Sequence, residues 1–350
     1  MKTKLKSKKW KSLVSGILLA ASASSFLIAP VFAAEYTDPL TGVVKTDKAI
    51  IKSDGNKVSY NSTTDTITYD FKGQDHTFTV KDKDAIATNT DGNNHNYIFN
   101  NVADDGSKGT LHIYQSNNQN NSYDGVNGFV ASGGKVTVNS NLDITATSDY
   151  ASTGVTVAKG ADLVINGNVK MRKDDPSNPW GIITKNVHGN VGPGGGAGSM
   201  DDGYDANYTG ARWQPSAFSV GYTRGNITVN GDVDVAVRGT AVNVGAYNAA
   251  EGVHPYDLAS VSLVGDSTRI ITPYREKNFV EGFGEFIEPY YSLACYGGTI
   301  NVNVKNMEAQ KGKVEIVGNI MAMKRSEYTH TSDVYQDSRI NLALTTADSS

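Results

Sequence analysis

Cysteine is almost absent from this chain, which has one, Cys295, in 350 residues. A single thiol excludes an internal disulfide framework and a cysteine-based metal centre. Leu293, Ala294 and Tyr296 surround it in the sequence. We therefore expect Cys295 to be a small buried side chain rather than a reactive group.

Motifs for nucleophilic catalysis, phosphate binding and zinc binding are missing as well. The six histidines are dispersed, and none has a second histidine two to four residues away. We expect no catalytic residue, no cofactor and no metal site. One alternative stays open, because carbohydrate-active solenoid enzymes use carboxylates on neighbouring coils. Asp143 with Asp234, or Asp232 with Asn168, could stack in that way, or could be solvated residues that face outward.

Long apolar runs are confined to the first 33 residues. Six lysines precede an apolar stretch from Leu13 to Ile28, and Val31-Phe32-Ala33 has the form of a cleavage site. This pattern predicts a signal peptide at residues 1–33. An uncleaved membrane anchor is the alternative, since the apolar stretch approaches spanning length. Removing the six lysines changes the net charge from −4 to −10. An acidic exported product is a poor partner for nucleic acid.

A short pattern recurs in place of these missing features. Alternating strand residues flank a polar corner in four stretches, which are Val136–Ile144, Leu163–Met171, Ile227–Val235 and, more loosely, Val314–Ala322. Alternation indicates a strand with one buried face. A unit this small cannot bury that face alone, so its recurrence favours stacked copies.

Two folds are compatible with this pattern. Asn-Gly between alternating runs is also a hairpin signal, and a meander of hairpins would give an antiparallel sandwich or barrel. A parallel β-helix is favoured because a glycine turn precedes each copy. It is also favoured because Asn139, Asn166 and Asn230 occupy one position of the repeat, where stacked amides form ladders. We predict an all-β, right-handed parallel β-helix.

The lysine-rich leader, the repeated corners and the segment Ser338–Ser350 resemble the passenger domains of autotransporters of Gram-negative-type bacteria. The resemblance implies a β-helical, adhesin-like passenger exported by an outer-membrane barrel at the C-terminus of the same polypeptide. The sequence contains no such barrel, so we expect a passenger truncated before it. We expect an irregular N-terminal cap at 34–110 and the β-helix at 111–350.

Two insertions interrupt the predicted β-helix, at 172–216 and 273–291. The first is rich in Gly, Pro and Asp and carries four aromatic residues, which are Trp180, Tyr204, Tyr208 and Trp213. Exposed aromatic side chains on a loop often contact sugars or proteins, although they could instead cover the solenoid wall. The second is expected to be a long loop or a short helix packed on the stack.

The predicted function is adhesion or cell-surface contact without catalysis, by a protein exported to the cell surface or outer membrane, or secreted. The expected partner is a host or bacterial surface protein or a glycan. A carbohydrate-active β-helix enzyme, of the lyase or glycosidase type, is the alternative.

Overall fold

A computed structural model describes residues 35–37, 44–46, 57–81, 84–89, 93–117, 126–148, 152–184, 215–221, 225–245, 259–280, 284–322, 325–326, 335–336 and 338–344. These residues form strands, turns and irregular segments, with no helix among them. The described part therefore holds no helix that could cross a membrane. The predicted signal peptide, residues 1–33, lies outside it.

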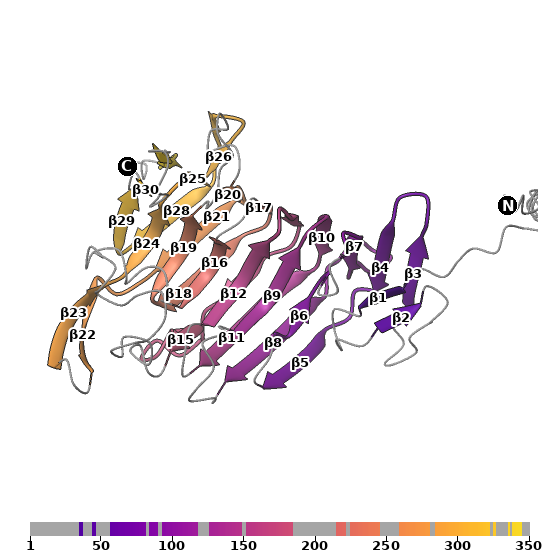
Figure 1. The fold of residues 1–350 in the computed structure, drawn as a ribbon, viewed down its shortest axis with the longest axis horizontal. Helices are drawn as coiled ribbons and strands as arrows, with labels where there is room; N and C mark the ends of the chain where they lie inside the picture. The colour runs from indigo at the N-terminus through magenta and orange to yellow at the C-terminus, as the bar shows by residue number, and fades with distance from the viewer. Residues whose placement is uncertain are drawn as a thin grey trace, which may run out of the picture.

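Three long sheets make up the body of the molecule (Figure 1). In spatial order, sheet 1 contains β3 (Lys57–Asn61), β4 (Thr66–Asp70), β7 (Asn96–Asn100), β10 (Lys135–Asn139), β13 (Asp162–Ile165), β17 (Gly225–Val229), β20 (Ala259–Leu263), β25 (Gly298–Val302) and β32 (Ser338–Leu342). Sheet 2 contains β5 (His76–Lys81), β8 (Thr110–Asn117), β11 (Asn141–Ser148), β14 (Val169–Met171), β18 (Val233–Arg238), β21 (Ser267–Ile271) and β28 (Lys313–Val317), with β15 (Ile182–Thr184) between β11 and β18. Sheet 3 contains β6 (Ile86–Ala87), β9 (Val126–Ser132), β12 (Ser152–Ala158), β16 (Ser216–Gly221), β19 (Thr240–Gly245), β24 (Tyr291–Cys295) and β29 (Asn319–Ala322).

Four small antiparallel pairs lie outside these sheets. They are β1 (Glu35–Thr37) with β2 (Val44–Thr46), β22 (Arg275–Val280) with β23 (Gly284–Pro289), β26 (Val304–Lys305) with β27 (Glu308–Ala309), and β30 (Arg325–Ser326) with β31 (Tyr335–Gln336). Figure 1 shows the β22–β23 pair projecting away from the stack.

The chain passes through sheets 1, 2 and 3 in turn and then starts the next coil. The first coil is β4–β5–β6, the seventh is β25–β28–β29, and β32 begins an eighth. Every pairing between successive coils is parallel; Val136 faces Leu163, and Leu163 faces Ile227. An antiparallel meander is therefore excluded, and the fold is a parallel β-solenoid with three sheets.

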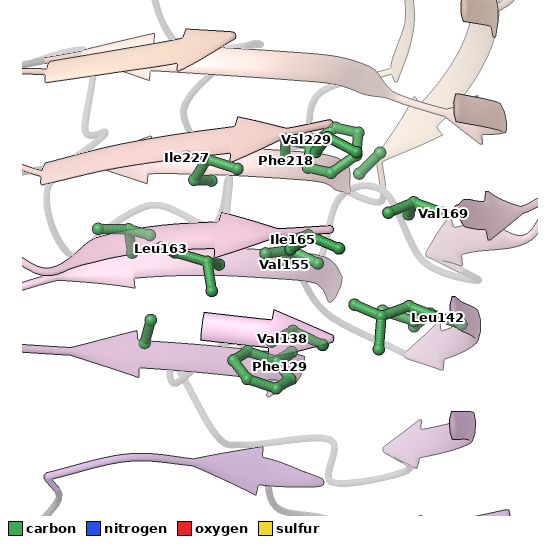
Figure 2. Packing of buried hydrophobic residues seen from close by; sticks show 14 of the residues in the cluster. Phe129, Val138, Leu142, Val155, Leu163, Ile165, Val169, Phe218, Ile227 and Val229 are labelled. Atoms are coloured by element: carbon green, nitrogen blue, oxygen red, sulfur yellow. The ribbon is translucent and has the colours of Figure 1, made fainter. Parts of the chain in front are cut away.

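Alternating residues of all three sheets fill the interior. Figure 2 shows these apolar side chains in successive layers, with Phe129 and Phe218 contributed by sheet 3 and Leu142 and Val169 by sheet 2. Each of these residues is at most 1% exposed. Full burial of such a side chain stabilises the fold by about 1.5–3 kcal/mol. Cys295 belongs to the same core and is fully buried, as its apolar neighbours predict.

Two boundaries differ from the sequence-based expectation. The parallel stack begins at Thr66, not near 110, because β4 pairs antiparallel with β3 on one side and parallel with β7 on the other. The last repeat copy, Val314–Ala322, lies in sheets 2 and 3 instead of sheets 1 and 2. Alternation has the same period in every sheet, so it cannot distinguish one corner from the next.

The expected insertions also need correction. Within 172–216, β15 returns to sheet 2 and pairs with β11 and β18, so only 172–181 and the undescribed residues 185–214 interrupt the coil. Within 273–291, the chain forms the β22–β23 hairpin; the expected loop or short helix is wrong. Phe279 and Val280 precede Gly282 and Phe286 and Ile287 follow it, so strand-forming pairs flank a residue type that favours turns.

Candidate functional site

The corner between sheets 1 and 2 is tight and regular in coils 3 to 6, whereas coil 2 lengthens it with 101–109 and coil 7 with the β26–β27 hairpin. Asn166 donates from Nδ2 to Asn139 Oδ1 at 2.8 Å, and Asn230 donates to Asn166 Oδ1 at 2.8 Å. Asn139 donates in turn to Asn100 at 3.4 Å, and Asn100 to Asp70 at 3.4 Å. One ladder of side-chain hydrogen bonds therefore joins coils 1 to 5, and it includes two residues beyond the three that the repeat predicts.

The two positions that follow the asparagine in this corner account for the Gly and for the Asn or Asp of the repeat. A Cβ built on Gly231 would lie 2.2 Å from Gly167 O, so the stacked backbones leave no room for a side chain there. One residue further on, side-chain oxygens accept the backbone N–H of the next coil: Asn141 Oδ1 accepts from Asn168 at 3.0 Å and Asn168 Oδ1 from Asp232 at 2.9 Å. All three corner positions are thus committed to the scaffold.

The edge between sheets 2 and 3 is different. Coil 5 crosses it through Gly239 alone, whereas coil 4 inserts 185–215 there and coil 6 inserts the β22–β23 hairpin. Loops commonly carry function on a rigid scaffold. This edge, with the adjoining outer face of sheet 2, is therefore the candidate functional site.

Trp180 is the one predicted contact residue that the structure describes. It ends a loop that leaves sheet 2 after β14, forms a bridge with Arg172, and is half-buried. Gly181 then donates to Ala236 O at 2.9 Å and returns the chain to the sheet. Tyr204, Tyr208 and Trp213 lie outside the described residues.

A row of charged residues crosses the outer face of sheet 2. Parallel register places six of them side by side on successive coils, in the order His112, Asp143, Lys170, Asp234, Arg269 and Glu315. After His112, negative and positive side chains alternate. Parallel pairing puts residues two coils apart at about 10 Å, so Asp143 and Asp234 stand on either side of Lys170.

Most groups in this row have a hydrogen-bonding or oppositely charged neighbour. His112 Nδ1 lies 3.0 Å from Asp143 Oδ2, and Arg269 Nε lies 2.9 Å from Glu315 Oε2. Lys170 Nζ donates to Asp174 Oδ1 at 2.7 Å, which raises the pKa of Lys170 and lowers that of Asp174. Because pairs like these satisfy one another at an exposed surface, each stabilises the fold only weakly.

Asp234 differs from the other carboxylates in the row. Partial burial raises its pKa, and the charges of Arg172 and Lys170 oppose that rise. Arg172 Nη1 lies 3.7 Å from Asp234 Oδ1, too far for a hydrogen bond. A partly desolvated carboxylate beside cations is a common feature of functional sites, although structural ion networks also produce it.

The row supports binding better than catalysis. An inverting glycosidase places its carboxyl groups ~6.5–9.5 Å apart with a water between them. Here Lys170 occupies the position between Asp143 and Asp234. Asp232 and Asn168, the other suggested pair, are joined through a backbone hydrogen bond of the corner. In the described part of the chain, no group of three or more His, Cys, Asp or Glu could hold a metal ion.

Sequence reasoning found Asp143 and Asp234 but missed their neighbours. Nothing in a single alternating run shows which residue of another coil it will face. A second missed cluster lies at the N-terminal hairpin, where Asp65 Oδ1 accepts from Tyr60 at 2.9 Å and lies 2.6 Å from His95 Nδ1. This cluster fastens the β3–β4 turn to the residue before β7.

Comparison with known proteins gives no relative from which a role could be transferred: no family model, curated protein or solved structure matches this chain.

Proposed function

We propose that this protein is an exported, surface-displayed β-solenoid that acts by binding, in adhesion or cell–cell contact, and has no catalytic activity. The observation that carries the proposal is the division of the solenoid's surface. In coils 3 to 6 the corner between sheets 1 and 2 is committed to hydrogen bonds that join coils, whereas coils 4 and 6 carry long insertions between sheets 2 and 3. A rigid scaffold that carries inserted segments suits contact with a large partner.

The rest of the proposal draws on the sequence. The leader supports export, and the resemblance to autotransporter passengers supports a right-handed coil and a C-terminal outer-membrane barrel in the full-length product. The partner would be a surface protein or glycan of a host or of another bacterium. The acidic charge opposes binding to nucleic acid.

Adhesion is testable in cells. A deletion strain should adhere to surfaces and aggregate less than its parent, and expression of the gene in the deletion strain should restore both properties. Beads coated with the purified protein should bind the same cells. Equal adherence by parent and deletion strain, together with inert beads, would contradict the proposal.

A carbohydrate-active enzyme remains the second candidate, because Asp234 is partly desolvated and lies beside Arg172 in the row that contains Asp143. Purified protein would be incubated with acidic and neutral polysaccharides, and reducing and unsaturated ends would be measured. Activity that disappears in both Asp143→Asn and Asp234→Asn would establish this function in place of pure binding.

A further inference from the structure

The hairpin formed by β22 and β23 has a strongly fixed root, although it leaves the stack. Asn319, on the following coil, donates from Nδ2 to Tyr274 O at 2.7 Å and to Tyr290 O at 2.8 Å, so one amide holds both legs. Tyr290 N also donates to Tyr274 O at 3.2 Å, and the side chain of Tyr290 is fully buried.

Two buried hydroxyl groups, on residues that flank the hairpin in the sequence, also stabilise this root. Thr272 Oγ1 lies 3.0 Å from Ser292 Oγ, which donates to Val317 O at 2.8 Å. Thr272 and Ser292 are 1% and 0% exposed. Gly318 has a φ of 135°, and a Cβ there would lie 2.1 Å from Thr272 Oγ1. These contacts fix the direction in which the hairpin leaves coil 6.

Beyond the root, the hairpin has unpaired edges. Six residue pairs join β22 to β23, from Arg275 with Pro289 to Val280 with Gly284, and neither strand pairs with any other described strand. A two-stranded hairpin alone is only marginally stable in water, and a third strand adds backbone hydrogen bonds. Free strand edges accept extended peptides in this way.

Charge indicates which kind of strand would fit. Residues 275–289 contain four glutamates, at 276, 281, 285 and 288, against Arg275 and Lys277. The register places Glu276 opposite Glu288, and like charges directly opposite each other destabilise a pair of strands. A cation brought by a partner would relieve this repulsion, whereas a second copy of the hairpin would add to it.

We propose that the β22–β23 hairpin binds an extended basic polypeptide segment of a partner protein, which adds to the hairpin as a third strand. The proposal deepens the contact function proposed above and rests on it. Phe279, Val280, Phe286 and Ile287 lie on the same strands, so the segment should alternate basic with apolar residues.

A labelled peptide of alternating Lys and Val tests this directly by fluorescence anisotropy with the purified full chain. Wild-type protein should bind it at least tenfold more tightly than a Glu-Val peptide, and more weakly as salt is raised. A Lys-Val peptide with alternate amides N-methylated keeps its charge but cannot pair along one edge, so it should bind at least tenfold more weakly. Hydrogen exchange should slow in 275–289 when the unmodified peptide is bound.

Two variants keep the root and the solenoid. In the first, Asn-Gly replaces 277–287, which leaves Glu276 opposite Glu288 and should abolish peptide binding. In the second, Glu276→Lys with Glu288→Lys should reverse the preference toward the Glu-Val peptide. Circular dichroism would verify that both variants remain folded.

The proposal is overturned if the shortened variant binds as wild type does, if N-methylation has no effect, or if the hairpin dimerises the protein without binding peptide. Bead adhesion separates it from the broader function. If beads coated with the shortened variant adhere like wild type, the hairpin proposal alone fails. If wild-type beads do not adhere at all, the adhesion proposal fails independently of peptide binding.

Discussion

The corner between sheets 1 and 2 and the edge between sheets 2 and 3 are built from the same coils but obey different rules. At the first, coils 3 to 6 turn through three residues whose side chains and backbone bond to the next coil. At the second, the connection varies from one glycine in coil 5 to the β22–β23 hairpin in coil 6. An added residue would break these bonds, so the corner of coils 3 to 6 resists insertion, whereas coils 2 and 7 lengthen the same corner and coils 4 and 6 lengthen the edge between sheets 2 and 3.

The largest expected effect on stability comes from a substitution at the tight corner between sheets 1 and 2. Gly231→Ala places a Cβ 2.2 Å from Gly167 O, and backbone on both sides must shift. We expect a loss of about 2–3 kcal/mol in the free energy of unfolding, measured by urea titration with circular dichroism. Gly245→Ala is the matched control, since its Cβ meets nothing nearer than Tyr296 at 3.8 Å; an equal loss there would show that the corner is not special.

The next largest effect on stability is expected from the asparagine ladder. Asn166→Val removes one hydrogen bond to Asn139 and one from Asn230, and should cost about 1–2 kcal/mol. Valine is the natural choice because Val264 occupies this position in coil 6. Asn230→Val removes only the bond to Asn166, so urea titration should give about half the loss. Equal losses would mean that the amides act singly and not as a ladder.

The contrast between the two edges also decides what could be read from the sequence. The repeat predicted the parallel solenoid and the stacking of Asn139, Asn166 and Asn230, because a ladder demands the same residue type at the same position. The charged row escaped prediction, since His112 and Asp143 lie 31 residues apart in the sequence and meet only when coil 3 stacks on coil 2. Val314 was assigned to the wrong corner because the edge between sheets 2 and 3 has no residue signature of its own.

A smaller effect, of opposite sign, is expected inside the solenoid near that second edge. Gln115 is 3% exposed, and in the described structure neither of its side-chain polar atoms has a hydrogen-bond partner. Its register neighbours are Val80 and Ala146. Gln115→Met keeps the volume and removes the unsatisfied amide, so the free energy of unfolding should rise by about 1 kcal/mol.

Asn101 provides the control for that gain. It is fully buried, but its Nδ2 donates to Gln74 O at 2.9 Å and to Ser140 Oγ at 3.1 Å. Asn101→Leu should therefore destabilise the protein in the same urea titration. If Gln115→Met is also destabilising, the amide of Gln115 has a hydrogen-bond partner in solution, such as a bound water.

The smallest effect concerns coil 7, where the corner between sheets 1 and 2 is opened by the β26–β27 hairpin. Asn306 and Met307 form its two-residue turn with φ of 51° and 65°. Asparagine tolerates this left-handed region, but methionine does not, and Met307 is 70% exposed without packing to offset the strain. Met307→Gly should raise the free energy of unfolding by about 0.5 kcal/mol, whereas Asn306→Gly should change it less. If Met307→Gly instead lowers the free energy of unfolding with unchanged circular dichroism, the methionine side chain packs against the protein in solution. The corner of coil 7 would then be as tightly constrained as the corners of coils 3 to 6.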